Sequence, residues 1–151
     1  MTVEIYTDGS ARGNPGPGGY GAILKYGQHE RELSQGYHLT TNNRMELLAT
    51  IVALETLTRD GLNVMIYSDS KYVVEAVEKK WVFGWEQKNF KDKKNPDLWQ
   101  RFLKAYRRHH VRFTWIKGHN NHHYNERCDV LATRAADFGP WLEDTGFKSG
   151  Q

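Results

Sequence analysis

Alternating apolar and polar residues dominate the first third of the chain. The stretch VEIYT at residues 3–7 alternates, the glycine-rich GNPGPGG at residues 13–19 interrupts it, and YGAILKY and ERELSQGYHL then flank the short turn GQH. A period of two predicts half-buried strands, and a short polar turn between two such stretches predicts a hairpin. We therefore expect a meander of three antiparallel strands within residues 3–39.

From Asn43 onward the hydrophobic period becomes that of a helix. Apolar residues recur along one stripe of RMELLATIVALETL at residues 44–57, which predicts a buried helix with Asn43 as its N-cap. The apolar run NVMIYSD at residues 63–69 predicts a further strand. The apolar residues from Tyr72 to Val77 then predict a short helix.

The second half of the chain continues with helices and one more strand. NPDLWQRFLKAYRR at residues 95–108 predicts a helix with Asn95 as N-cap and Pro96 at the first helical position. VRFTWI at residues 111–116 predicts a strand, and ERCDVLATRAADF at residues 126–138 predicts the last helix. The order β-β-β-α-β-α-α-β-α predicts a mixed sheet, in which helical crossovers join the meander to parallel strands.

The composition is that of one globular domain. The chain has 151 residues, of which 38% are hydrophobic and 26% charged, enough for a buried core. No apolar run is long enough to span a membrane and no signal-peptide pattern follows Met1, so we expect a cytoplasmic protein. The single cysteine, Cys128, cannot form an internal disulfide and cannot by itself build a thiolate zinc site.

Positive charge is concentrated in one segment. Residues 79–94, KKWVFGWEQKNFKDKK, contain six lysines against Glu86 and Asp92, a local net charge of +4 in a chain whose net charge is +3. Lysines interleaved with tryptophans are typical of a surface that binds nucleic acid. The alternative is that Trp81 and Trp85 belong to the core and that the lysines form a solvated face.

Four carboxylates stand at the ends of predicted elements. Asp8 and Asp69 end strands, in YTDGS and YSDSK, while Glu46 is the third helical residue after Asn43 and Asp129 is in the first turn of the last predicted helix. Each acid has a structural explanation as a turn former, a capping-box partner or a complement to a helix dipole. If the two strands are parallel neighbours, however, their carboxylates meet at one edge and require a cation between them. Two Mg²⁺ or Mn²⁺ ions held there would anchor a phosphodiester and activate a water.

Taken in order, the motifs resemble bacterial type 1 ribonuclease H over nearly the whole chain. They are YTDGSARGNPGPGGYGAILKY, TTNNRMEL, YSDSKYV, DLWQRF, WIKGHNNHHYNERCDVLA and LEDTGF. The resemblance implies a ribonuclease H-like α/β fold of mixed α+β type, with a five-stranded mixed sheet, a three-stranded antiparallel meander and helices on both sides. It also implies a single domain over residues 1–151, with a basic handle at about residues 79–95 and a loose tail from about residue 139.

The resemblance also implies an activity. Such an endonuclease hydrolyses the RNA strand of RNA/DNA hybrids without sequence specificity, by a two-metal-ion mechanism that leaves 5′-phosphate and 3′-hydroxyl ends. The implied cofactor is Mg²⁺, with Mn²⁺ as the alternative, and the implied partner is a hybrid duplex bound by a monomeric, cytoplasmic enzyme with no membrane partner. The metal-binding and catalytic acids implied by the motifs are Asp8, Glu46, Asp69 and Asp129, with Glu126 as a secondary acid.

The loop histidine His119 of KGH matches the family's mobile histidine, which assists proton transfer or product release. A histidine beside a metal site can move a proton near neutral pH. Its alternative explanation is surface polarity shared with His122 and His123, or an adventitious soft-metal site.

Substrate-binding residues also follow from the resemblance. The loop after Asp8 would contact the minor groove, Thr41 would bind a DNA phosphate, and the handle lysines would face the duplex while its tryptophans partly pack the handle. The implied set is Gly9, Ser10, Asn14, Thr41, Asn42, Asn43, Lys71, Trp81, Trp85, Lys88, Lys91, Lys93 and Lys94.

Three features depart from the family pattern. Lys71 stands where the family usually has glutamine, Leu39 stands where a basic residue is expected, and the handle is several residues shorter. We therefore predict weaker substrate binding with the chemistry intact. Two other functions stay open: another enzyme of the same fold, such as a DNA strand transferase or DNA nuclease, and a hybrid-binding module without catalysis.

Overall fold

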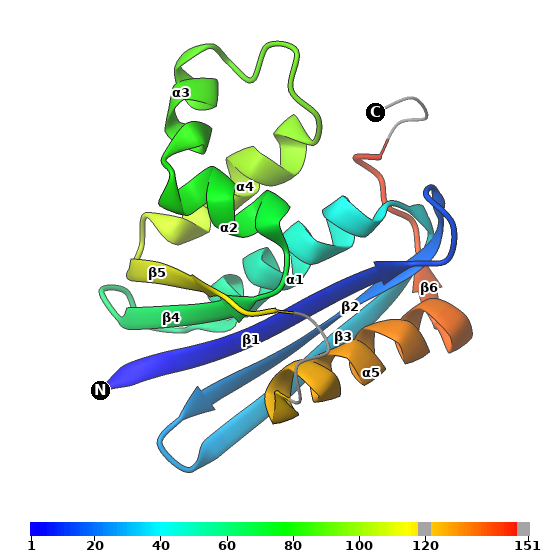
Figure 1. Ribbon diagram of the computed structural model, residues 1–151, viewed down its shortest axis with the longest axis horizontal. Helices are drawn as coiled ribbons and strands as arrows, with labels where there is room; N and C mark the ends of the chain where they lie inside the picture. The colour runs from blue at the N-terminus through cyan, green and yellow to red at the C-terminus, as the bar shows by residue number, and fades with distance from the viewer. Residues whose placement is uncertain (118–121, 148–151) are drawn as a thin grey trace.

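The computed structural model of the protein describes residues 1–117 and 122–147, and these form an α/β fold around one mixed sheet (Figure 1). The strands are β1 (Thr2–Ala11), β2 (Gly16–Tyr26), β3 (His29–Thr40), β4 (Asn63–Ser68), β5 (His110–Trp115) and β6 (Trp141–Leu142). The helices are α1 (Asn42–Thr56), α2 (Lys71–Glu78), α3 (Trp81–Gln87), α4 (Pro96–Tyr106) and α5 (His123–Phe138). Within the described residues the sheet has six strands rather than the predicted five, because β6 adds a short parallel strand beside β3.

The strand order is β5-β4-β1-β2-β3-β6. The predicted meander is confirmed, since β1 pairs with β2 and β2 with β3, both antiparallel. β1 also pairs in parallel with β4, with Tyr6 opposite Tyr67, and β4 pairs in parallel with β5. The carboxyl ends of β1 and β4 therefore lie side by side, where ligand sites form in sheets of this kind.

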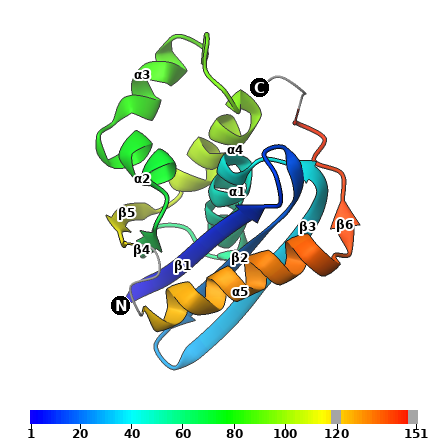
Figure 2. The same ribbon diagram turned by 45° about the vertical axis from the view of Figure 1, so that its right-hand side comes forward.

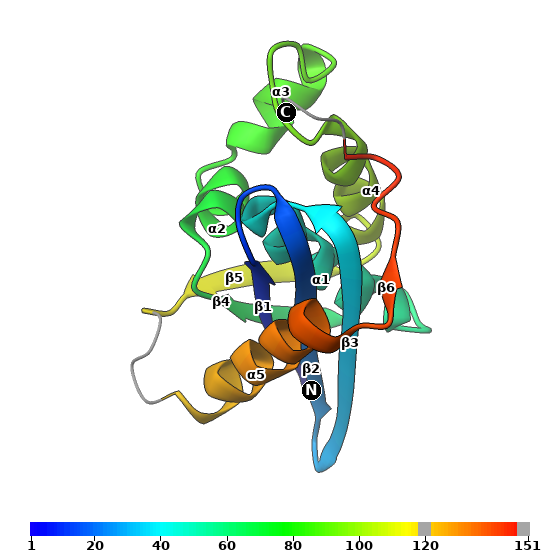
Figure 3. The ribbon, with the colours of Figure 1, turned by 90° about the vertical axis from the view of Figure 1, so that its right-hand side faces the viewer.

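Helices cover both faces of the sheet, as predicted (Figures 2 and 3). Successive residues of β1 point to opposite faces, so Ile5 belongs to the large core that includes the residues of α1, while Tyr6 belongs to a small cluster with Cys128 of α5. α5 lies close to the strands because β2 has Gly21 beneath it: a Cβ there would lie 2.5 Å from the Cys128 carbonyl oxygen. No helix within the described ranges has the length and apolar character needed to cross a membrane.

α1 begins two residues earlier than predicted, and its N-cap is Thr41 rather than Asn43. The Thr41 hydroxyl accepts a hydrogen bond from the Arg44 backbone N–H at 3.2 Å. Threonine and asparagine both cap helices well, so the run TNN offers three consecutive candidates and the sequence does not decide between them. The prediction of an Asn43 cap with Glu46 at the third helical position was wrong, and Glu46 is the fifth residue of α1.

The handle projects from the body between α2 and α4 (Figure 1). It contains α3, which the sequence pattern did not predict. α4 begins at Pro96 as predicted, but the Asn95 side chain does not cap it. Instead Asn95 donates a hydrogen bond to the Tyr72 hydroxyl at 3.0 Å and accepts one from Arg44 at 3.2 Å, which ties the end of the handle to α2 and α1.

Arg44 is fully buried and joins three distant parts of the chain. Its guanidinium donates to both carboxylate oxygens of Asp97 at 3.0 and 2.7 Å, and to both of Asp144 at 2.7 and 2.9 Å. Asp144 also accepts a hydrogen bond from the Thr40 hydroxyl at 2.7 Å. The segment for which the sequence suggested a loose tail thus includes β6 and a carboxylate bound to a buried arginine.

Candidate active site

Three carboxylates from three elements converge at the carboxyl ends of β1 and β4. Asp8 is in the last part of β1, Glu46 is in α1, and Asp69 directly follows β4. One carboxylate oxygen from each lies within 4.8 Å of the other two. Asp8 and Glu46 are buried, at 7% and 5% exposure, and Asp69 is half-buried. The parallel pairing of the two strands thus produces the convergence that YTDGS and YSDSK suggested.

Gly9 allows β1 and α1 to approach this closely. A Cβ at Gly9 would lie 2.3 Å from the Glu46 backbone nitrogen and 2.4 Å from the Met45 carbonyl carbon. Since both neighbours are backbone atoms, any side chain would push α1 away from the sheet. The Gly9 N–H also donates to the Asp8 carboxylate at 2.9 Å, which fixes its orientation.

Burial and mutual repulsion make the ionised form of these acids unfavourable. Burial, and after it the charge of Asp69, raises the pKa of Asp8 to about 7. Burial and the charges of Asp8 and Asp69 raise the pKa of Glu46 well above its usual range. The Glu46 Oε1 atom is buried and has no hydrogen-bond partner among the described residues. A divalent cation with a preference for oxygen ligands would supply both the missing charge and the missing partner, so this donor set fits Mg²⁺ or Mn²⁺.

Asp129 lines the same cavity without belonging to the closest group of three acids. The cavity has a volume of about 420 Å³ and is lined by Asp8, Gly9, Ser10, Asn42, Asn43, Glu46, Asp69, Ser70, Lys71, Tyr72 and Asp129; we call it the acid cavity. α5 begins at His123 rather than at the predicted residue 126. Asp129 therefore lies in the second turn of the helix, and its predicted place in the first turn was wrong.

The other predicted groove residues border the acid cavity in different ways. Ser10, Asn42 and Asn43 line it directly. Asn14 accepts a hydrogen bond from the Asn42 backbone N–H at 3.1 Å, which ties the glycine-rich loop to the start of α1. Thr41 uses its hydroxyl to cap the same helix.

The predicted histidine and the secondary acid differ in what the structure describes of them. His119 lies outside the described residues. His122 is the N-cap residue of α5 and makes no side-chain cap there, while its ring lies 5.6 Å from that of Tyr6. Glu126 is exposed in the first turn of α5 and is absent from the described lining of the acid cavity.

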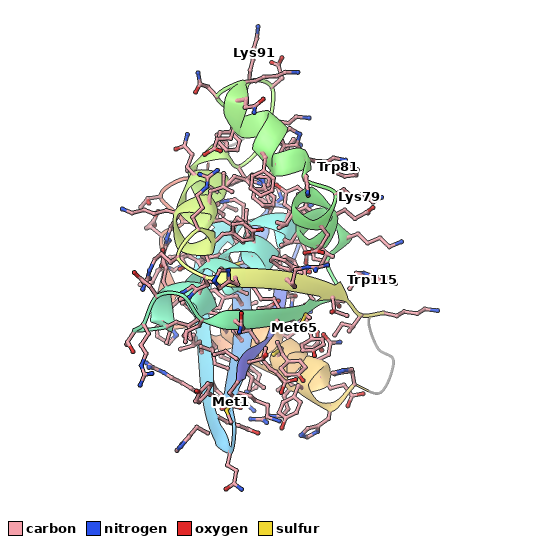
Figure 4. The ribbon with its side chains drawn as sticks, turned by 90° about the vertical axis from the view of Figure 1, so that its left-hand side faces the viewer. Met1, Met65, Lys79, Trp81, Lys91 and Trp115 are labelled. Carbon is pink, nitrogen blue, oxygen red and sulfur yellow. The ribbon has the colours of Figure 1, made fainter. Side chains whose placement is uncertain are left out.

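The two handle tryptophans differ in their surroundings. Trp85 is half-buried and packs edge-on against Trp99, with ring centroids 5.7 Å apart, and the Lys93 ammonium lies 5.0 Å from its ring. Trp81 is 48% exposed, with the Lys79 ammonium 5.2 Å from its ring. The handle lysines Lys88, Lys91, Lys93 and Lys94 are exposed. Figure 4 shows Lys91 at the tip of the handle and Trp81 closer to α2.

Sequence reasoning missed three residues at this site. Tyr72 and Ser70 line the acid cavity, and Ser70 caps α2 by accepting a hydrogen bond from the Val73 N–H at 3.2 Å. Trp115, the last residue of β5, donates from its indole N–H to the Asp69 carbonyl oxygen at 3.1 Å. The signal for Trp115 lay in the strand register, because Trp115 pairs with Ser68 in β4, next to Asp69.

Comparison with known proteins decides the family. The family model described as RNase H matches residues 1–137. The chain belongs to the ribonuclease H family. This confirms the predicted ribonuclease H family, and the bacterial relative reported next confirms the predicted resemblance to a bacterial ribonuclease H.

Individual ribonucleases H match along most of their length. Ribonuclease H from Edwardsiella ictaluri is 57% identical over 153 residues, which cover 98% of this chain and 97% of that protein. The crystal structure of LC9-RNase H1, a type 1 RNase H with the type 2 active-site motif, superposes with a TM-score of 0.81 at 32% identity and covers 99% of this chain and 78% of that one. LC11-RNase H1, crystallised in complex with an RNA/DNA hybrid, gives a TM-score of 0.66 at 29% identity and covers 89% of this chain and 96% of that one.

Proposed function

We propose that the acid cavity is the active site at which this ribonuclease H hydrolyses the RNA strand of an RNA/DNA hybrid, with Asp8, Glu46, Asp69 and Asp129 as its catalytic acids. The observation that supports this most strongly is the convergence of the Asp8, Glu46 and Asp69 carboxylates. Two of these acids are buried, and one of them, Glu46, has an oxygen without a hydrogen-bond partner among the described residues. The hybrid in the LC11-RNase H1 complex supports the choice of substrate.

The four acids would hold two Mg²⁺ ions, with Mn²⁺ as the alternative. When bound, such ions polarise the scissile phosphate, activate a water and stabilise the leaving oxygen, which gives 5′-phosphate and 3′-hydroxyl products. The protein contributes position: β1, β4 and α1 fix three of the carboxylates before any substrate arrives. Because the pKa of Asp8 is raised to about 7, this carboxylate would have to lose its proton to hold a cation, so the site would bind a cation more weakly at acid pH.

A proton carrier completes the proposed chemistry. We assign this part to His119, because the KGH motif matches the family pattern and because a histidine titrates near neutral pH. His119 lies outside the described residues, and the assignment depends on the sequence motif.

The hybrid would lie across the acid cavity and along the handle. Small residues at the cavity, Gly9 and Ser10, would let the minor groove and its 2′-hydroxyl groups approach, with Asn14, Asn42 and Asn43 as hydrogen-bonding neighbours. Thr41 would bind a DNA phosphate beside the helix it caps. The exposed handle lysines would bind phosphates without reading sequence, and the exposed ring of Trp81 would pack against a sugar or base.

One assay tests this function against the two alternatives left open by the sequence. The protein is incubated with Mg²⁺ and end-labelled RNA/DNA hybrid, double-stranded DNA or single-stranded RNA, with and without EDTA. We expect cleavage of the hybrid RNA strand alone, lost in EDTA, with 5′-phosphate ends. Cleavage of duplex DNA would indicate a DNA nuclease, and binding of the hybrid without cleavage would indicate a binding module; either result would overturn the proposal.

We also propose that the enzyme acts as a monomer in the cytoplasm. All four proposed catalytic acids meet within a single copy of the chain, so the proposed chemistry needs no residue from a second copy, and relatives such as the ribonuclease H of Edwardsiella ictaluri are bacterial. Light scattering during size-exclusion chromatography, with activity measured across the peak, tests the first part. Activity confined to a dimer peak would contradict it, and fractionation of cells tests the location.

A further inference from the structure

A single indole orders two parts of the acid cavity. Trp115 ends β5 and is 42% exposed. Its Nε1–H donates to the carbonyl oxygen of Asp69 at 3.1 Å, and the Lys71 ammonium lies 4.9 Å from the centroid of its ring. The Trp115 side chain therefore contacts both Asp69, a predicted metal ligand, and Lys71, two residues further along the chain.

Lys71 stands between two cavities. It lines the acid cavity and also a second cavity of about 410 Å³, which we call the handle cavity, lined by Lys71, Tyr72, Glu75, Trp81, Trp85, Asp92, Lys93 and Lys94. Figure 4 shows Trp115 at the end of β5 with Trp81 and Lys79 on the same side of the molecule, nearer the handle. A nucleic acid strand that extends from the acid cavity to the handle therefore passes Lys71.

The charge of Lys71 contributes little to the fold itself. Among the described residues Lys71 makes no ion pair. Its charge adds a smaller contribution to that of Lys79, the residue just after α2, in lowering the pKa of Glu75, and Glu75 forms its ion pair with Lys79. Lys71 is also the first residue of α2, where a positive charge opposes the helix dipole. Lys71 is exposed and its ammonium lies over the Trp115 ring, a position from which its charge can bind an anion.

We propose that Lys71, positioned by Trp115, binds a backbone phosphate of the hybrid between the acid cavity and the handle. This inference depends on the proposed function of the acid cavity. Lys71 contributes one of the phosphate contacts that make binding salt-dependent, and Trp115 is a positioning residue, since its ring orders Lys71 and its N–H orders the backbone of Asp69. The positive charge of Lys71 therefore strengthens hybrid binding. This is the opposite of the weaker binding predicted from the three departures from the family pattern.

The test measures hybrid affinity as a function of salt. A fluorescent RNA/DNA hybrid is titrated with the Asp129→Asn protein in Mg²⁺, a background chosen to prevent cleavage during the measurement. Lys71→Gln should weaken binding about two- to fivefold at 0.1 M salt and lower the slope of log affinity against log salt by about one. The matched control is Lys25→Gln, since the Lys25 ammonium also lies over an aromatic ring, 4.5 Å from that of Tyr124, and lines neither cavity.

Variants of Trp115 separate its ring from its N–H. Trp115→Leu should lower the salt slope as much as Lys71→Gln does, and the double variant should lower it no further. Trp115→Phe keeps a ring for Lys71 and should keep the salt slope. It loses the hydrogen bond to the Asp69 carbonyl, so kcat should fall when this variant is made in the enzyme that keeps Asp129. A general loss of stability would not change the number of phosphates neutralised, so the slope distinguishes positioning from folding.

Three results would overturn the inference: an unchanged slope in Lys71→Gln, an equal loss in Lys25→Gln, or additive losses in the double variant. If Trp115→Leu does not fold, the comparison of Lys71→Gln with Lys25→Gln still decides whether Lys71 contacts a phosphate. A lowered salt slope in Trp115→Phe would contradict the positioning role of the Trp115 ring. Cleavage by the unmodified enzyme is measured separately. Absence of cleavage together with the expected slopes would refute the proposed function and leave the phosphate site standing.

Discussion

The acid cavity and the handle differ in how the fold supports their charged groups. In the cavity, Asp8 and Glu46 are almost completely buried and are held by strand pairing and by the contact of Gly9 with α1. In the handle, the lysines at residues 88–94 are exposed and extend from turns that follow a short helix. Each buried carboxylate is fixed in one position by backbone packing, so no other group can replace it. Exposed lysines that bind a polyanion each neutralise a phosphate, so the remaining lysines still bind when one is lost. The loss of one group should therefore be severe in the cavity and modest in the handle.

The largest effect should come from a single cavity acid. Asp69→Asn removes a negative charge from the group of three carboxylates, so kcat for hybrid cleavage should fall by at least about 100-fold, more than the loss typical of outer-shell partners of a metal. Hybrid binding and the circular dichroism spectrum should be unchanged. The matched control is Asp60→Asn, an exposed aspartate outside the acid cavity, which should keep full activity. An Asp69→Asn enzyme with more than a tenth of the activity would contradict the role assigned to this acid.

The second effect concerns the cost of assembling the cavity without metal. In the folded protein the pKa of Asp8 is raised from 3.8 to about 7, so the folded state keeps this proton at pH values where the unfolded chain has lost it. Stability of the metal-free protein should therefore fall as the pH rises from about 4 to about 7. Asp8→Asn removes this titration and should stabilise the metal-free protein by about 1 to 3 kcal/mol at pH 8, with little difference below pH 4.

Urea denaturation in EDTA across this pH range measures the difference directly. Addition of Mg²⁺ provides the control, since it should stabilise the unmodified protein more than the Asp8→Asn variant. A variant that is less stable than the unmodified protein at pH 8 without metal would refute the account of repulsion in the cavity.

The smallest effect per residue should be found in the handle. Changing Lys91, Lys93 and Lys94 together to alanine should raise KM about five- to tenfold at low salt, with kcat within about twofold. The slope of log KM against log salt should fall by about three, one for each phosphate contact that is lost. The control removes the same charge elsewhere, with Arg31, Arg59 and Lys104 changed to alanine. Steady-state kinetics at several salt concentrations measure both variants. An unchanged salt dependence would place the binding surface outside the handle, and a large loss of kcat would remove the distinction between the two regions.

The same distinction explains what the sequence could predict. Alternation gave the three strands of the meander, and the two strand-ending aspartates indicated where the parallel strands would meet, because both signals depend on local pattern. The packing of Gly9 against the backbone of α1 has no such signal. It depends on a contact between residues far apart in the chain, which only the folded structure supplies.

The errors in the prediction have physical causes in the same terms. The helix start at Thr41 could not be separated from Asn43, since consecutive residues had similar capping ability. The start of α5 was missed because HHYN has no apolar stripe, and this moved Asp129 by one turn. α3 was hidden because its seven residues, WVFGWEQ, include Gly84 and are too short to show a helical period.

The buried pairing of Arg44 with Asp144 has a consequence for how the enzyme matures on the ribosome. The two residues are 100 positions apart, so an emerging chain exposes the arginine long before its second carboxylate partner is synthesised. A buried guanidinium that lacks a partner is strongly destabilising. The helix that holds Glu46 should therefore reach its final stability only after residue 144 has left the exit tunnel, so completion of the catalytic centre depends on a segment synthesised about a hundred residues later.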